Sequence, residues 1–133
     1  MDNKYIGTEL NIPLNKEQIK FNKQKLLKVN NVYVATLIHV VEEEFDGICK
    51  HRFTYEVQFD DYQLEISRNI TIKKDRIERE LVRWLQKHSN YDPSYEWYDK
   101  YLGTKNLILI NKYKNYKYVE DVASLEGLTN EYI

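Results

Sequence analysis

Apolar and polar residues alternate along the chain between residues 49 and 72. The apolar parity carries Cys49, His51, Phe53, Tyr55, Val57 and Phe59, then Tyr62, Leu64, Ile66, Ile70 and Ile72. Successive side chains of a strand point to opposite faces, so the pattern predicts two strands with one buried face. Asp60 and Asp61 interrupt it and predict a two-residue turn, because aspartate tolerates positive φ. That turn sets Phe53 opposite Arg68, a charge on the apolar parity, and predicts a bulge or a strand end there.

The stretch before this hairpin is apolar on both parities. Residues 32–41 are rich in β-branched side chains, which predicts a central strand covered on both faces. The acidic run 42–44 and Asp46-Gly47 predict the turn that follows. A second hairpin is expected from a strand at 106–112 and a partner strand at 116–119.

One amphipathic helix stands out after the meander. Its apolar residues recur at helical spacing at Ile77, Leu81, Trp84, Leu85 and His88. Asp75 and Glu78 form a capping box before them. Shorter helices are expected at 16–28, 94–103 and 119–125. The sequence therefore predicts an α+β fold, an antiparallel four- to five-stranded sheet with a central meander over 32–72 and helices packed on one face. The expected core is Phe53, Tyr55, Val57, Leu64, Ile66, Leu81, Trp84 and Leu85.

Composition places the chain among globular proteins of one domain. We expect residues 1–133 to form a single domain, because 42% hydrophobic and 31% charged residues argue against disorder. One cysteine excludes an internal disulfide and fits a reducing compartment. The longest apolar run, 32–41, is too short to cross a bilayer, so we expect a cytoplasmic protein with no membrane partner. Heavy use of Lys, Asn, Ile and Tyr is typical of AT-rich coding sequences, as in low-GC bacteria and their phages.

The net charge of −1 is unevenly spread along the chain. Residues 1–29 carry +3, residues 30–67 carry −6, residues 68–90 carry +4 and residues 91–133 carry −2. Such segregation predicts either opposite fields on different faces or charge balance between neighbouring elements.

Arginines gather on the polar face of the expected helix. Arg76, Arg79 and Arg83 are spaced by three and four residues, opposite the apolar face. Such a stripe suits a phosphate backbone or an acidic protein surface. The alternative is an ordinary solvated face, with Glu80 partly neutralising the stripe.

Basic and aromatic residues alternate between residues 112 and 118. Lys112, Lys114, Tyr116 and Lys117 belong to this run, with tyrosines between the lysines. Single-strand binders use this combination, because bases stack on rings while cations follow phosphates. The alternative is a hairpin whose tyrosines pair across strands and whose lysines protect a sheet edge.

The third candidate group consists of aromatic residues in one short segment, Tyr95, Trp97 and Tyr98. Tryptophan and tyrosine are enriched at the centres of protein interfaces, but they also complete cores in tyrosine-rich proteins. We therefore include these residues among the candidate partner-binding positions and leave the core alternative open.

No catalytic or metal-binding constellation is expected, and no cofactor. Cys49, His51 and His39 lack the further ligands of a zinc site. We therefore expect a small non-enzymatic binding or inhibitor protein, phage- or mobile-element-encoded, that engages a nucleic-acid-handling host protein complex. The first alternative is a direct nucleic-acid-binding protein that uses the basic helix and the Lys/Tyr hairpin. The second is a small enzyme or nucleotide-binding protein that uses the cysteine and histidines.

Overall fold

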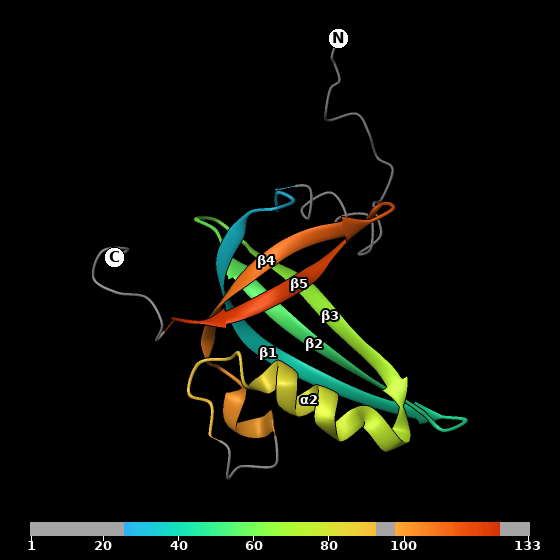
Figure 1. Ribbon diagram of the computed structural model, residues 1–133. Helices are drawn as coiled ribbons and strands as arrows, with labels where there is room; N and C mark the ends of the chain where they lie inside the picture. Colours follow the sequence, from blue (N-terminus) through green and yellow to red (C-terminus); the bar gives the residue numbers. More distant parts are fainter. Residues whose placement is uncertain (1–25, 93–97, 126–133) are drawn as a thin grey trace.

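The computed structural model describes residues 26–92 and 98–125, which form one five-stranded antiparallel sheet and one α-helix (Figure 1). The strands are β1 (Val32–Phe45), β2 (Ile48–Gln58), β3 (Gln63–Lys73), β4 (Lys105–Tyr113) and β5 (Tyr116–Ser124). A 3-10 turn, η2 (Lys74–Arg76), leads into helix α2 (Ile77–Leu85), and a second, η3 (Tyr98–Tyr101), precedes β4. The predicted α+β class and antiparallel sheet are confirmed, with one α-helix in the described part of the chain.

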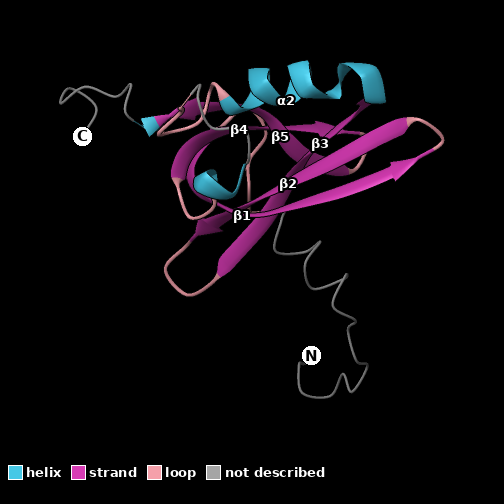
Figure 2. Cartoon of the chain, turned by 90° about the horizontal axis from the view of Figure 1, so that it is seen from below, coloured by secondary structure: helices cyan, strands magenta, loops and turns pink. Residues whose placement is uncertain are grey.

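The strand order is β3-β2-β1-β4-β5, so β1 lies at the centre and pairs with both β2 and β4. A register shift between Leu37 and His39 bends β1 where it passes from one partner to the other. The strongly twisted sheet curls so that its edge strands β3 and β5 come into contact (Figure 2). The result is a partly open barrel, with α2 lying against its open side (Figure 1).

The β2–β3 hairpin has the predicted register. Tyr55 pairs with Ile66 and Val57 with Leu64, and the Phe59 N–H donates to the Tyr62 carbonyl across the predicted turn at 2.8 Å. The expectation of a bulge or a strand end at Arg68 is wrong in both forms, because the ladder runs without a break to Lys73. The charge on the buried parity is accommodated by the tertiary contacts of its side chain, described below.

Strand β1 differs from prediction in two ways. It continues through the acidic run 42–44 to Phe45, and these carboxylates lie near basic groups, as in the 3.9 Å pair of Glu43 with Lys50 on β2. Its two faces are also unequal, because Val32 and Val34 are exposed whereas Ala35 and Leu37 are buried. Being central in the sheet therefore did not mean being covered on both faces.

The helix expected at 119–125 is wrong, because residues 116–124 form β5. Ile110 pairs with Val119 and Leu109 with Asp121, which leaves Glu120 as an extra residue in the ladder. This bulge turns Val119 and Val122 toward the same buried face, and their spacing of three imitates a helix.

Two other predicted helices fall partly outside the described residues. Residues 26–28 form a turn, not the end of a helix, and 16–25 lie outside. Of the helix expected at 94–103, residues 93–97 lie outside, and the rest forms η3 followed by Gly103 at a φ of +87°. A left-handed glycine at this place ends the turn, as the sequence suggested.

The core lies inside the barrel, under α2. The predicted core residues are buried in one cluster, with Leu81 packed half-buried against it. Leu27, Leu37, Tyr101, Ile108, Ile110 and Val119 complete the centre. No helix in the described part of the chain is long and apolar enough to span a membrane.

Candidate functional site

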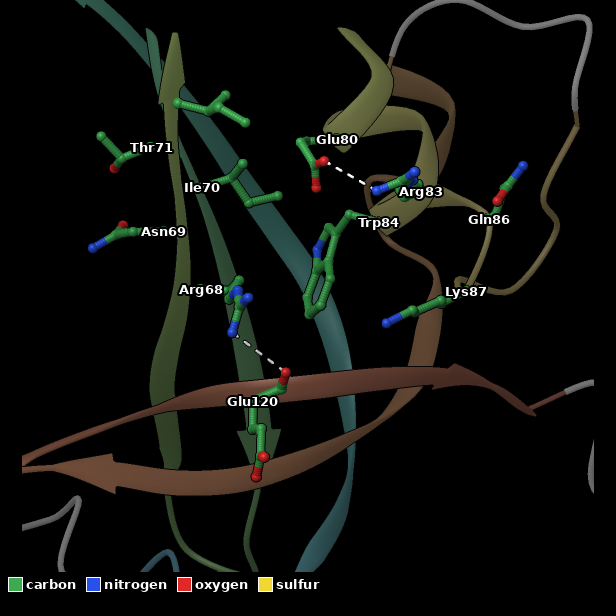
Figure 3. A pocket seen from close by; sticks show the side chains of 11 residues that line it. Arg68, Asn69, Ile70, Thr71, Glu80, Arg83, Trp84, Gln86, Lys87 and Glu120 are labelled. Carbon is green, nitrogen blue, oxygen red and sulfur yellow. Dashed lines mark hydrogen bonds and ion pairs between the residues drawn. The ribbon is translucent and has the colours of Figure 1, made fainter. Parts of the chain in front are cut away.

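A groove lies where the barrel stays open, between β3, α2 and β5 (Figure 3). Its volume is about 560 Å³. The lining residues are Arg68, Asn69, Ile70, Thr71 and Ile72 of β3, Glu80, Arg83 and Trp84 of α2, Gln86 and Lys87 just after it, and Glu120 of β5. Three cations face two carboxylates, so the lining carries a net charge of +1. This groove, with its slight excess of positive charge, is therefore a candidate binding site.

The three predicted helix arginines are all exposed. Arg76 ends η2, and Arg79 and Arg83 lie on α2. Arg83 is the one that lines the groove, and its Nη1 lies 3.2 Å from Glu80 Oε1. The stripe thus exists as a solvent-facing surface, and Glu80 partly neutralises it as the alternative reading stated.

The Lys/Tyr run forms the β4–β5 hairpin, with Tyr113 paired to Tyr116. Their side chains are 67% and 75% exposed, and the Lys114 ammonium sits 5.5 Å from the centre of the Tyr113 ring. Lys114 itself adopts a φ of 56° in the turn. Lys112 is exposed as well. This tip therefore presents two exposed rings with the Lys114 ammonium beside one of them, while Lys112, opposite Lys117 in the ladder, lies on the other face of the hairpin.

Lys117 differs from its neighbours, because it is half-buried and donates a hydrogen bond to the Leu27 carbonyl. Burial lowers its pKa, and the positive charge of Lys112 acts in the same direction. Its contact joins the hairpin to residues 90 positions earlier in the chain, so the structure gives Lys117 a positioning role.

The third predicted group is only partly within the described residues. Tyr95 and Trp97 lie outside the described residues, and Tyr98 begins η3. Tyr101 is fully buried in the core.

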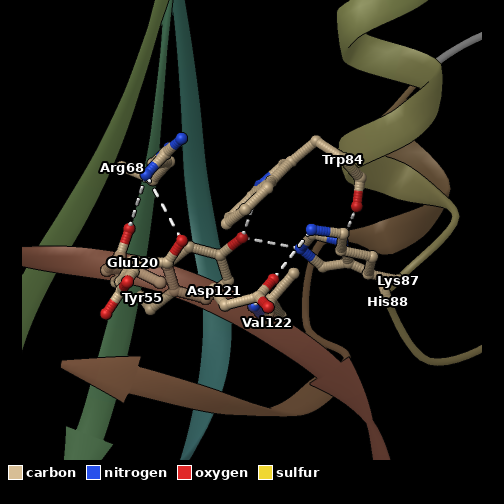
Figure 4. A network of polar contacts seen from close by, with 9 residues as sticks. Tyr55, Arg68, Trp84, Lys87, His88, Glu120, Asp121 and Val122 are labelled. Atoms are coloured by element: carbon tan, nitrogen blue, oxygen red, sulfur yellow. Dashed lines mark hydrogen bonds and ion pairs between the residues drawn. The ribbon is translucent and has the colours of Figure 1, made fainter. Parts of the chain in front are cut away.

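Arg68 is the residue that the sequence pattern misjudged (Figure 4). Its Nη1 donates to the carbonyl oxygens of Val119 and Glu120 on β5, each at 3.3 Å. Its guanidinium also lies 5.1 Å from the centre of the Trp84 ring, a cation–π contact. Arg68 therefore joins the two edge strands at the point where the sheet leaves them unpaired.

A buried hydrogen-bonded ring lies beneath the groove (Figure 4). His88 Nδ1 is 3.0 Å from the Trp84 carbonyl, which can only accept, so Nδ1 carries the proton. His88 Nε2 then accepts from the Tyr55 hydroxyl at 2.6 Å, and that oxygen accepts from Trp84 Nε1 at 3.0 Å. Every polar group of the ring is satisfied, which a buried network requires.

The electrostatics of this ring keep it neutral. Burial lowers the pKa of His88 to about 4, helped by the charge of Lys87 and opposed by the hydrogen bond to the Trp84 carbonyl. Burial likewise raises the pKa of Tyr55 far above its usual range. Both groups therefore hold α2 on the sheet in their uncharged forms at neutral pH.

Lys87 and Asp121 form an ion pair at the rim of this network, with Nζ and Oδ1 2.8 Å apart. Partial burial is the largest single influence on the pKa of the Asp121 carboxyl and raises it. The hydrogen bonds from Lys87 and the Val122 N–H, together with the charges of Lys87 and Arg68, outweigh burial and lower that pKa. Both side chains are half exposed, so this pair contributes little to stability.

The residues of the enzyme alternative do not converge. His39 is exposed, Cys49 is buried, and His51 Nε2 lies 3.6 Å from Glu42 Oε1. Among residues 26–92 and 98–125, no group of three or more His, Cys, Asp or Glu side chains could hold a metal ion.

Comparison with known proteins adds no relative: no family model, no curated protein and no solved structure matches the chain.

Proposed function

We propose that this is a non-enzymatic binding protein that contacts single-stranded nucleic acid through the tip of the β4–β5 hairpin. The observation that carries the proposal is the exposed pair Tyr113 and Tyr116, with the ammonium group of Lys114 beside the Tyr113 ring and the exposed Lys112 one residue before it. Rings exposed to this extent have not been recruited to the core, so they remain available for stacking on bases. The neighbouring cations would follow the phosphates.

The architecture supports the same proposal. A five-stranded partly open barrel, with its first strand shared between two partners and its helix between the third and fourth strands, resembles the OB-fold. OB-folds bind oligonucleotides or oligosaccharides through strands 2 and 3 and the loops that join strands 1 to 2 and 4 to 5. The Lys/Tyr tip occupies the second of these loops. Because a fold hosts many functions, the side chains of the tip carry the argument and the resemblance adds to it.

Replacing both tyrosines by alanine is expected to weaken binding to a fluorescein-labelled oligo(dT) at least about tenfold, since each stacked base contributes about 1–3 kcal/mol. Fluorescence anisotropy at low salt measures the affinity. The matched control is Tyr113→Phe with Tyr116→Phe, which keeps both rings and should bind as the wild type does.

Neutralising two cations, by Lys112→Gln and Lys114→Asn, should reduce the dependence of log affinity on log salt concentration by about 0.7 per lost phosphate contact. Asparagine suits the positive φ at Lys114. Equal affinities of the alanine and wild-type proteins, or no binding of oligo(dT) or oligo(U) at low salt, would rule the proposal out.

A second candidate is engagement of a protein partner, such as a nucleic-acid-handling complex, through the helix arginines. The exposure of Arg76 at the end of η2 and of Arg79 and Arg83 on the adjoining helix α2 favours it.

Charge reversal at Arg79 and Arg83 should then weaken partner binding about tenfold or more, because like charges would face each other across the interface. Circular dichroism should show an unchanged fold, since both side chains are exposed. A pull-down from lysate, with and without nuclease, measures the effect. Lys28→Glu with Lys105→Glu is the matched control, with the same charge change at exposed sites off the helix. If a partner that survives nuclease treatment is retained equally by the Arg79/Arg83 reversal and by the Lys28/Lys105 control, the arginine surface does not bind it.

A further inference from the structure

The edge of β3 is the second surface of the molecule that is built to bind, and it lies away from the hairpin tip. β3 pairs only with β2, and within the described part of the chain no strand is paired with its other edge, although β5 contacts β3 through Arg68. Five consecutive β3 residues, from Arg68 to Ile72, line the groove. The side chains of Asn69 and Thr71 point away from α2 and that of Ile70 points toward it (Figure 3). The face of β3 that carries Ile70 is therefore turned toward α2, and the lining by consecutive residues of both parities places the backbone edge of the strand at the groove as well.

The register identifies the free backbone groups. The Phe59 N–H donates to the Tyr62 carbonyl at one end of the hairpin, and the Lys74 N–H donates to the Gly47 carbonyl at the other, at 2.8 and 2.9 Å. Hydrogen-bonded and non-hydrogen-bonded pairs alternate along an antiparallel ladder. Counting from either end makes Ile70 opposite His51 a hydrogen-bonded pair.

Asn69 opposite Arg52 and Thr71 opposite Lys50 are then non-hydrogen-bonded pairs. The N–H and C=O groups of Asn69 and Thr71 consequently turn away from β2, toward the groove. An unpaired row of this kind is a template for another strand.

The walls of the groove restrict what can occupy it. Arg83 and Lys87 form the α2 side, and Ile70 with the edge of Trp84 supplies an apolar floor. At about 3.3 Å per residue, the five lining β3 residues offer roughly 13 Å of edge, enough for about four residues of an extended chain. Alternate side chains of such a chain would face α2, where a carboxylate meets the cations and an apolar group meets Ile70.

We propose that the edge of β3 takes up an extended acidic peptide segment of a partner protein by strand addition. Main-chain hydrogen bonds to Asn69 and Thr71 would supply affinity, and the groove cations and apolar floor would select the sequence. A peptide backbone matches the free N–H and C=O groups, whereas a nucleic acid has no such ladder. A second copy of this chain is disfavoured, because pairing two β3 edges would bring like-charged groove cations together. The proposal goes beyond single-strand binding, because it uses another surface and another class of partner.

The test uses the full chain and a fluorescein-labelled octapeptide of alternating glutamate and valine. Two matched peptides separate the contributions: alternating lysine and valine reverses the charge, and N-methylation of alternate amides in the glutamate peptide removes strand pairing while keeping the charge. We expect both to bind at least about tenfold more weakly, since each removes one of the two recognition elements. Equal binding of the N-methylated and parent peptides, or no binding of the parent peptide, would overturn the proposal.

Amide hydrogen exchange locates the contact. The parent peptide should slow exchange at Asn69 and Thr71 about tenfold or more, while Ile70, already bonded to β2, should change little. Protection of the same two amides by oligo(dT), or by self-association in the absence of peptide, would assign the edge to a different occupant and overturn the proposal.

Variants of the protein complete the test. Thr71→Pro removes one outward N–H, which an edge strand tolerates, and should abolish binding of the glutamate peptide. Thr71→Val keeps that N–H and should bind the peptide as the wild type does. Should the proline variant not fold, Arg83→Gln provides the second test: it should weaken peptide binding, and Arg79→Gln, on α2 but outside the groove lining, should not. Equal binding by Arg83→Gln and Arg79→Gln would count against the groove. Because the two proposals use different surfaces, a groove variant that loses peptide binding should still bind oligo(dT). Measuring both ligands on each variant therefore distinguishes the failure of one proposal from the failure of the other.

Discussion

Replacing Trp84 by alanine is expected to lower the free energy of unfolding by about 3–5 kcal/mol, the range for a large aromatic removed from a packed core. Trp84 is buried, and its indole packs edge-on against Phe53 with ring centres 6.4 Å apart. The change also removes the hydrogen bond to Tyr55 and uncovers the guanidinium of Arg68. Urea denaturation followed by circular dichroism measures the loss.

Two further variants separate the causes. Val82→Ala lies on the same helix at an exposed position and should change stability by less than about 0.5 kcal/mol. Trp84→Phe keeps a ring but loses the N–H, so its free energy of unfolding should lie between those of Trp84→Ala and Val82→Ala. A Trp84→Ala protein as stable as Val82→Ala would show that α2 is not held on the sheet by this residue.

Acid is expected to destabilise the protein through His88. The unfolded chain binds a proton to this histidine near pH 6.5, whereas the folded chain resists protonation until about pH 4. Between these values the unfolded state holds more protons, so stability falls as the pH is lowered through the window and is fully present above it. At about 1.4 kcal/mol per pH unit, the whole loss amounts to about 3 kcal/mol. Protonation would also set a second N–H donor against the Tyr55 hydroxyl, which must then turn its own proton elsewhere.

Unfolding free energies measured between about pH 5 and pH 7.5 test this linkage. The His88→Gln variant should be less stable than the wild type at neutral pH. Its free energy of unfolding should fall less on acidification, because the titrating group is gone. His39→Gln removes an exposed histidine and should keep the wild-type profile. An unchanged pH profile in His88→Gln would contradict the buried neutral histidine.

Local patterning predicted the hairpins and the main helix. Alternation determines which side chains share a face, and a two-residue turn leaves one register, so the pairing of Tyr55 with Ile66 followed from the sequence alone. The apolar spacing of α2 likewise placed Trp84 and Leu85 on the buried side. These are short-range consequences of backbone geometry, and neighbouring residues suffice to specify them.

Bulges and contacts between distant segments escaped the same reasoning. The extra residue at Glu120 changes the parity of β5 in the middle of the strand, so its apolar spacing imitated a helix. Whether a central strand is covered on both faces depends on what packs against it, which the composition of β1 does not tell. Exposure of Tyr113 and Tyr116 was also undecided, since tyrosines of a hairpin serve a core or a surface equally well.

The sequence by itself determined the α+β class, the antiparallel pairing of β2 with β3 and the buried faces of that hairpin and of α2, because side-chain periodicity acts over a few residues. Only the tertiary structure decided the roles of Arg68, His88 and the β3 edge. Arg68 looked like a misplaced charge until the curled sheet brought it to the β5 carbonyls, 51 and 52 residues along the chain. His88 looked like one more position on an apolar stripe until it met Tyr55. Such groups are stabilised by partners remote in sequence, and no local pattern encodes which partners the closing of the barrel will supply.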